Sequence, residues 1–208
     1  MDITLDRLVL DFARGVERAD AHGYQHTGQT RTFAAGIGPH SEDRTVELVL
    51  AEMTDRDPES YGPSARHVPY EPGSRQECDL CLGEPPTWTW AIEVKLLRML
   101  GDNGKEDPNM PKRILSPYPA HNSALTDTRK LAAGTLGHRR AILIVAYDYP
   151  NERRPSMRFR AEPMVDAFET LARSGPITLG PRQSARFEGL IHPHHREGFV
   201  FGWEVEPR

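Results

Sequence analysis

Apolar residues recur along this chain with two different periods, which predict its helices and its strands. A period of three or four residues, typical of amphipathic helices, marks four segments: residues 3–20, 41–53, 123–136 and 162–175. Ser41 is a favourable N-cap for the second helix, and acidic residues follow it in the first turn. Gly137 and Gly175 are the expected ends of the last two helices.

Shorter apolar runs between stretches rich in Gly and Pro predict the strands. The clearest strand lies within residues 139–150, where a continuous apolar run implies burial on both faces. The other predicted strands lie within residues 66–72, 76–82 and 88–97, with two edge strands within residues 185–207. The loop GEPPT is hairpin-like, so the strands at 76–82 and 88–97 are expected to be antiparallel neighbours. Residues 101–120 are too rich in Pro and Gly for a regular element, and so long a loop is typical of a functional segment.

The order of these elements favours an α/β fold with a mixed central sheet flanked by helices. At 208 residues the chain suits one compact domain, with residues 1–40 as a helix and loop extension and residues 41–208 as the main body. It has no run of about 18 apolar residues. It also lacks the basic and apolar pattern of a signal peptide, so we expect a cytoplasmic protein with no membrane span.

Charged side chains interrupt two neighbouring strands that are otherwise apolar. Asp79 lies within CDLCL, and Glu93 and Lys95 lie within WAIEVKLL. Because side chains alternate faces along a strand, Glu93 and Lys95 share one face, and Asp79 can join them on the face of Cys81, opposite Cys78. Two adjacent carboxylates stay ionised only beside a cation. Lys95 supplies one positive charge, and a bound divalent metal ion would supply the remaining positive charge. Oxygen ligands favour Mg²⁺ or Mn²⁺ over Zn²⁺ as that ion.

Asp79, followed in the next strand by Glu93-Val94-Lys95, resembles the PD-(D/E)xK signature of the restriction-endonuclease-like nuclease superfamily. The resemblance extends over about residues 41–149 and implies an α-β-β-β-α-β core. It implies catalytic roles for Asp79, Glu93 and Lys95, with Mg²⁺ held by the two carboxylates and the backbone carbonyl of Val94. In such a site the metal activates water, and the lysine orients or deprotonates that water and stabilises the transition state.

Two further positions follow from the same resemblance. Superfamily members carry a glutamate on the helix before the sheet; Glu47, favoured over Glu52, is the candidate for it and a possible further ligand. Cys78 stands where the signature usually has proline.

The motif is specific within this chain. Of its 26 basic residues only four are lysines, at positions 95, 105, 112 and 130, and only Lys95 has an acid two residues before it. In a chain that otherwise prefers arginine, a lysine between Val94 and Leu96 indicates a need for a compact ammonium group. The alternative is an exposed Glu93–Lys95 pair on an edge strand.

The net charge of −4 is unevenly distributed along the chain. Residues 1–94 carry −9, residues 95–160 carry +7 and residues 161–208 carry −2. A positive segment directly after the carboxylates suits a ligand with phosphate groups. The candidate contacts to nucleic acid are Arg98, Lys105, Lys112, Arg113, Arg129 and Lys130, and the basic segment RRPSMRFR at 153–160 extends this set. A solvated basic face would account for the same residues.

The expected function is therefore a metal-dependent nuclease, and the resemblance favours a DNA endonuclease of restriction, phage-defence or repair type over an RNA nuclease. One set of motifs per chain suggests a homodimer, or a partner protein of a defence or repair system, because cutting both strands of a duplex needs two sites. Two alternatives stay open: an inactive or partner-dependent nucleic-acid-binding module on the same fold, and a hydrolase of a smaller phosphorylated substrate.

Two other motifs bear on metals. Cys78 and Cys81 form a lone C-x-x-C within a strand, which predicts reduced packing residues rather than a zinc site. The segment HPHH at 192–195 resembles a metal cluster, but three neighbouring histidines rarely share one ion without further ligands.

Overall fold

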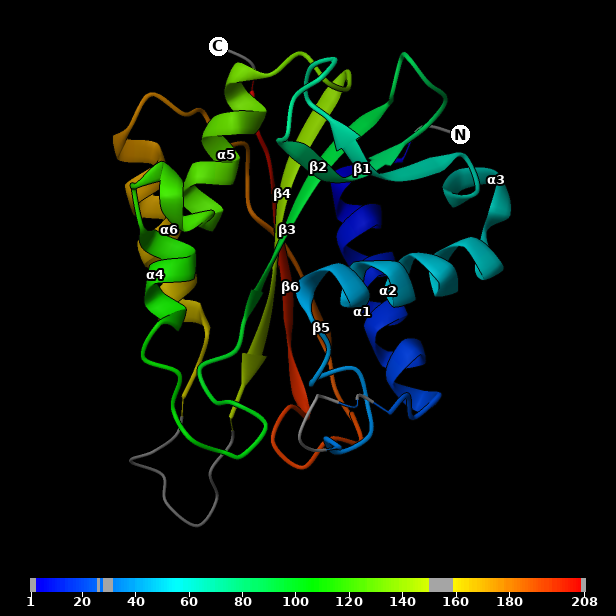
Figure 1. The fold of residues 1–208 in the computed structure, drawn as a ribbon, viewed down its shortest axis with the longest axis vertical. Helices are drawn as coiled ribbons and strands as arrows, with labels where there is room; N and C mark the ends of the chain where they lie inside the picture. Colours follow the sequence, from blue (N-terminus) through cyan, green and yellow to red (C-terminus); the bar gives the residue numbers. More distant parts are fainter. Residues whose placement is uncertain (1–2, 26, 28–31, 150–158, 207–208) are drawn as a thin grey trace.

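The computed structural model describes residues 3–25, 27, 32–149 and 159–206, which form a mixed six-stranded sheet covered by helices on both faces (Figure 1). The strand order is β1-β2-β3-β4-β6-β5. The strands are β1 Ser64–Pro69, β2 Glu77–Leu82, β3 Trp90–Leu97, β4 Arg139–Asp148, β5 Gln183–Phe187 and β6 Glu197–Glu204. The predicted α/β class and the mixed sheet are thus confirmed.

Pairing within the sheet is antiparallel except at its centre. β2 is antiparallel to β1 and β3, as the short connecting loop predicted, whereas β3 and β4 run parallel from Trp90↔Arg139 to Leu97↔Ala146. β6 lies between β4 and β5 and is antiparallel to both. The prediction of two edge strands near the C-terminus was therefore wrong for β6. Its Val200 and Trp203, which point to opposite faces, are both fully buried.

Helices cover the sheet in two layers (Figure 1). One layer holds α1 Leu5–Ala21 and α2 Glu42–Arg56, with the single turn α3 Pro58–Tyr61 after them. The other holds α4 Met110–Leu115, α5 Ala124–Ala133 and α6 Glu162–Ser174, with the 3₁₀ turn η1 Pro119–His121 between α4 and α5. Each layer buries its own apolar cluster against one face of the sheet.

The first helix belongs to the body of the fold. Leu8, Val9 and Phe12 of α1 are at most 1% exposed and pack in the same cluster as Val49 of α2 and Val200 of β6. Gly15 lets α1 and α2 approach closely, because a Cβ at this position would lie 2.8 Å from the side chain of Val49. No helix in the described ranges is long and apolar enough to cross a membrane.

The segment 101–120 is more regular than its composition predicted. It contains α4, whose Pro111 lies in the first helical turn, where a missing N–H costs nothing. Met110 and Ile114, four residues apart, anchor this helix in the core. The predicted end of α5 at Gly137 was also wrong. The helix is capped by Gly134, whereas Gly137, with φ of 74°, forms the turn into β4.

Candidate active site

Strand β3 presents Glu93 and Lys95 to the layer of α4, α5 and α6. Ala91 and Leu97, which have the same parity along the strand, pack in the apolar cluster under those helices, whereas Val94 packs under α1 and α2. Both charged side chains are buried, because only 2% of Glu93 and 8% of Lys95 is exposed. An exposed pair on an edge strand is therefore ruled out, since β3 lies inside the sheet.

Asp79 approaches from β2 at a point where the ladders of this strand are interrupted. The β2–β3 ladder ends at Leu80, and Asp79 Oδ2 instead accepts a 2.8 Å hydrogen bond from the N–H of Val94. On the other side, the β1–β2 register omits Asp79 and His67, and His67 has φ of 56°, which is uncommon outside glycine. These interruptions leave the carboxyl group of Asp79 close enough to Glu93 to raise the pKa of that side chain.

The same interruption moves Cys78. Strict alternation places Cys78 opposite Cys81, but both are buried in the cluster under α4, α5 and α6. The thiol of Cys78 donates to the carbonyl oxygen of Ile92 at 3.3 Å. Both cysteines are free thiols, so the prediction of reduced packing residues is confirmed.

Two carboxylates replace β2 as hydrogen-bond partners of β3 beyond the end of the ladder. Asp79 accepts from Val94 N, and Glu42 Oε2 accepts from Leu96 N at 2.9 Å. Buried backbone N–H groups require partners, so the divergence of β2 creates two positions that an acceptor side chain can fill. Glu42 is the first residue of α2, directly after the N-cap Ser41.

The ammonium group of Lys95 is held between helices α2 and α5. Its Nζ lies 2.7 Å from Glu42 Oε1 and 2.8 Å from Asp127 Oδ2. The contact with Asp127 is close enough for an ion pair, although its angles fall outside those of a hydrogen bond. Asp127 is only 1% exposed, and its other oxygen pairs with Lys130 Nζ at 2.5 Å. Burial alone would lower the pKa of Lys95, but the carboxylates of Glu42 and Asp127 outweigh burial and raise it above its ordinary value.

We call these side chains the acidic cluster: Glu42, Asp79, Glu93, Lys95, Asp127 and Lys130. It contains four carboxyl groups and two ammonium groups, so full ionisation leaves two uncompensated negative charges. Burial raises the pKa of Glu93 well above its usual range, and the charges of Asp79 and Asp127 raise it further. Without a cation, the raised pKa of Glu93 therefore favours a proton on this carboxyl group.

Tyr70 completes the surroundings of Glu93. Its hydroxyl donates a 2.6 Å hydrogen bond to Glu93 Oε1. Burial, followed by the charge of Glu93, raises the pKa of Tyr70, so the phenol remains a donor at neutral pH.

The donor set of the acidic cluster fits a hard divalent cation. Its two excess negative charges match the charge of the ion, and its side chains offer oxygen atoms alone. Within the described ranges, three ligand atoms of His, Cys, Asp or Glu lie within 4.8 Å of one another only at Asp102, His192 and His195. The acidic cluster therefore offers two adjacent carboxylates rather than a closed ring of three. Mg²⁺ commonly binds in this way, because it keeps several of its waters.

The glutamate that α2 contributes is not the one predicted. Glu47 lies away from the acidic cluster, and its carboxylate pairs with Arg44 at 2.5 Å and with Arg66 at 3.6 Å. Glu42, one and a half turns earlier, reaches Lys95 instead. In the sequence it resembles an ordinary first-turn acid that complements the helix dipole, so no local signal distinguishes it.

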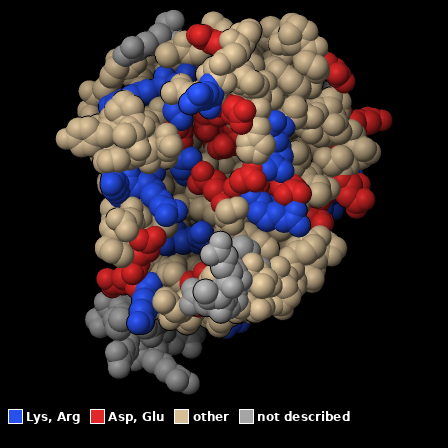
Figure 2. Space-filling view, in the orientation of Figure 1, with Lys and Arg blue, Asp and Glu red and all other residues tan. Residues whose placement is uncertain are grey.

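The predicted basic residues divide into three groups. Lys130 joins the acidic cluster, whereas Arg98 donates to the carbonyl oxygens of Gly38 and His40, and Arg129 donates to that of Pro117 at 2.7 Å. Lys105, Lys112 and Arg113 are exposed, and Arg129 is exposed as well. On the face shown in Figure 2, acidic side chains gather near the middle and basic side chains lie on both sides of them. The basic segment at 153–160 lies outside the described residues except for Phe159 and Arg160.

The acidic cluster opens to solvent only in part. The side chain of Glu42 is 32% exposed and that of Lys130 is 23% exposed, and these two mark its accessible side. Two surface cavities of about 300 Å³ lie elsewhere: one is lined by Asp148, Arg160 and Glu197, the other by Arg7, Arg14 and Tyr61. Neither contains a residue of the acidic cluster.

Comparisons of the chain with protein-family models, curated proteins and solved structures returned no match.

Proposed function

We propose that this protein is a metal-dependent nuclease that hydrolyses phosphodiester bonds, with DNA favoured over RNA. One observation carries the proposal: the carboxyl group of half-buried Asp79 acts on both the buried carboxyl group of Glu93 and the buried ammonium group of Lys95. Burying like charges is costly, and a fold retains such an arrangement when function requires it. The order α2, β1, β2, β3, α5, β4 also agrees with the α-β-β-β-α-β core of restriction-endonuclease-like nucleases.

Asp79 and Glu93 would hold Mg²⁺ or Mn²⁺, with the backbone carbonyl of Val94 as a further candidate ligand. When bound, the metal neutralises a phosphate oxygen and lowers the pKa of a coordinated water. Tyr70 orients Glu93, and the N–H of Val94 orients Asp79, so both carboxylates are fixed before the ion arrives.

Lys95 is better suited to stabilise charge than to abstract a proton. Its raised pKa keeps it protonated at neutral pH, and Glu42 and Asp127 fix its position. A fixed ammonium group can orient the attacking water and stabilise the negative charge that develops on phosphorus oxygens. Of the two roles expected for this lysine, the surroundings favour orientation and charge stabilisation over general-base catalysis.

A polymeric substrate agrees better with the accessible surface than a small one. The two cavities of about 300 Å³ lie away from the acidic cluster, which is accessible from the side of Glu42 and Lys130. Exposed Lys112 and Arg113 on α4 are available for backbone phosphates. For cleavage of both strands of a duplex, we propose a homodimer or a partner protein that supplies the second site.

Incubation of the purified chain with supercoiled plasmid, with Mg²⁺ or Mn²⁺ and with EDTA, tests this proposal. We expect metal-dependent nicking that Lys95→Ala and Asp79→Asn abolish and that Glu47→Gln, a change outside the acidic cluster, leaves nearly intact. Circular dichroism of each variant separates loss of the site from loss of the fold. If folded wild-type protein binds plasmid but does not cleave plasmid or RNA with either metal, the chain is a binding module.

A further inference from the structure

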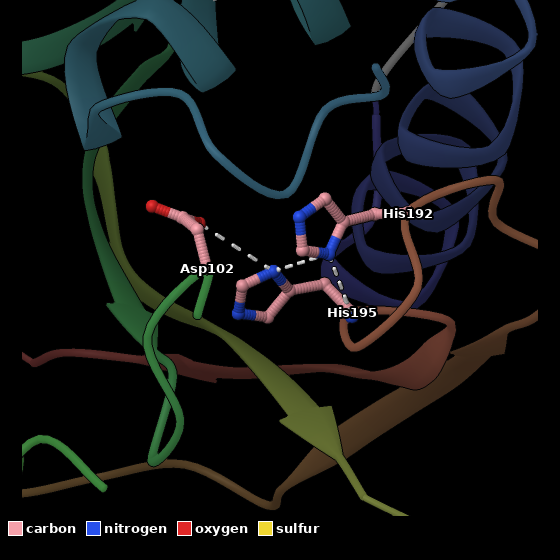
Figure 3. A group of neighbouring side chains, drawn as sticks. All are labelled: Asp102, His192 and His195. Carbon is pink, nitrogen blue, oxygen red and sulfur yellow. Dashed lines mark hydrogen bonds and ion pairs between the residues drawn. The ribbon is translucent and has the colours of Figure 1, made fainter. Parts of the chain in front are cut away.

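A second group of ligand atoms lies where two loops meet, away from the acidic cluster. Asp102 belongs to the loop between β3 and α4, and His192 and His195 belong to the loop between β5 and β6 (Figure 3). Both histidines are fully buried, and the side chain of Asp102 is 21% exposed. The proposed nuclease reaction uses none of the three.

The hydrogen bonds of His192 fix the position of its proton. Its Nδ1 accepts from the backbone N–H groups of His194 and His195, at 3.2 and 3.1 Å. A nitrogen that accepts carries a lone pair, so the proton of the neutral ring is on Nε2. A metal ion bound at this nitrogen would displace these two hydrogen bonds.

The contacts of His195 likewise place the proton of its neutral ring on Nε2. Its Nε2 lies 3.0 Å from the carbonyl oxygen of Leu100, which can only accept, so Nε2 carries the proton. Nδ1 of the neutral ring is then a lone pair, and it faces His192 Nδ1 at 3.0 Å. Asp102 Oδ1, a third acceptor, lies 3.8 Å from the same atom. Three lone pairs therefore converge with no hydrogen between them.

We propose that Asp102, His192 and His195 bind a divalent transition-metal ion, with Zn²⁺ as the best match. Nitrogen and carboxylate ligands at about 2.0–2.2 Å from a tetrahedral zinc ion lie about 3.3 Å apart, close to the 3.0 and 3.8 Å found here. Water would fill the fourth position. Imidazole ligands distinguish this site from the acidic cluster, whose oxygen atoms favour Mg²⁺.

A proton on His195 Nδ1 would also relieve the convergence, but it would place an imidazolium charge in a buried position.

The ion would fasten together two loops that are about 90 residues apart in the sequence. These loops already touch, because a Cβ on Gly104 would lie 2.8 Å from the ring of His194. The loop that Asp102 anchors also carries exposed Lys105. A bound ion would therefore hold the loop that carries Lys105 against the body of the protein.

Titration of the EDTA-treated and dialysed full-length chain with Zn²⁺, followed by calorimetry, tests this site. We expect one ion per chain at this site and weaker binding, by at least about tenfold, in Asp102→Asn and His195→Gln. His194→Gln is the matched control, since its ring is not a ligand, and it keeps wild-type affinity. Glu93→Gln also keeps the site, which separates it from the acidic cluster.

Co²⁺ provides an independent readout in the same variants. A tetrahedral nitrogen and oxygen site gives visible absorption that Asp102→Asn removes and His194→Gln retains. Asp102 is partly exposed in a loop, so this variant is expected to fold, and its circular dichroism confirms that. The proposal is overturned if folded wild-type protein takes up no Zn²⁺, or if Asp102→Asn binds it as tightly as the wild type does.

Discussion

Lys95 Nζ lies 2.8 Å from Oδ2 of Asp127, a carboxylate that is 1% exposed and comes from a helix on the same side of the sheet. Removal of one partner from such a pair leaves an uncompensated buried charge, which typically costs about 3–5 kcal/mol. The pair thus ties the chemistry of the site to the stability of the fold.

Lys95→Met should therefore destabilise the metal-free protein at pH 7 by about 3–5 kcal/mol. The loss should shrink toward pH 4, because burial raises the pKa of Glu42 and protonation then removes its unpaired negative charge. Urea unfolding in EDTA at both pH values measures this difference. Lys105→Met, at an exposed position, should stay within about 0.5 kcal/mol of wild type. Equal losses for the two variants would contradict the assigned ion pairs.

Glu42 and Glu47 lie on the same helix and are a matched pair for the plasmid assay. Glu42→Gln removes a partner of Lys95, so we expect a loss of cleavage of about a hundredfold or more. Glu47→Gln breaks only exposed contacts with Arg44 and Arg66, so activity should change less than about threefold. If Glu47→Gln lost cleavage and Glu42→Gln kept it, Glu47 would be the functional glutamate of this helix, as the sequence predicted.

Glu93→Gln should make the metal-free protein more stable at neutral pH. The pKa of Glu93 is raised by folding, so the folded state holds this proton more tightly than the unfolded state does. Stability therefore falls as pH rises from about 4.3, the ordinary glutamate value, toward the folded pKa. The neutral glutamine does not titrate, so the variant should not show this loss of folding stability with rising pH.

Thermal unfolding from pH 4 to 9 in EDTA, with wild type and Glu93→Gln side by side, measures the effect. With Mg²⁺ added, the wild type should become the more stable of the two proteins, because it binds the ion and the variant lacks one of the ligands. Parallel curves for the two proteins across this range would show that Glu93 is not perturbed.

Tyr70→Phe should destabilise the metal-free protein by about 1–2 kcal/mol, because it removes the 2.6 Å hydrogen bond to buried Glu93. It should also weaken Mg²⁺ binding, since the phenol helps to keep Glu93 ionised and in place. Tyr118→Phe is the control, because Tyr118 is 65% exposed. Calorimetric titration with Mg²⁺ and urea unfolding cover both expectations, and identical behaviour of the two variants would contradict them.

Local patterns determined much of this fold. Apolar periods along the chain placed the helices and strands, since burial of one face imposes a period of 3.6 or 2 residues on any sequence. The acids in CDLCL and WAIEVKLL stood out for the same reason, and alternation placed Glu93 and Lys95 on one face. The Pro and Gly content of residues 101–120 argued against the α4 helix, although its Pro111 lies in the first turn, where proline is harmless.

Contacts between distant segments were decided by the tertiary structure alone. Where β2 leaves β3, two backbone N–H groups lose their ladder partners, and Asp79 and Glu42 accept from them. The convergence of Asp102 with the histidines at 192 and 195 likewise depends on how two loops pack. Periodicity reports which face of its own element a residue occupies, whereas hydrogen-bond satisfaction and packing between elements determine which distant residue meets it.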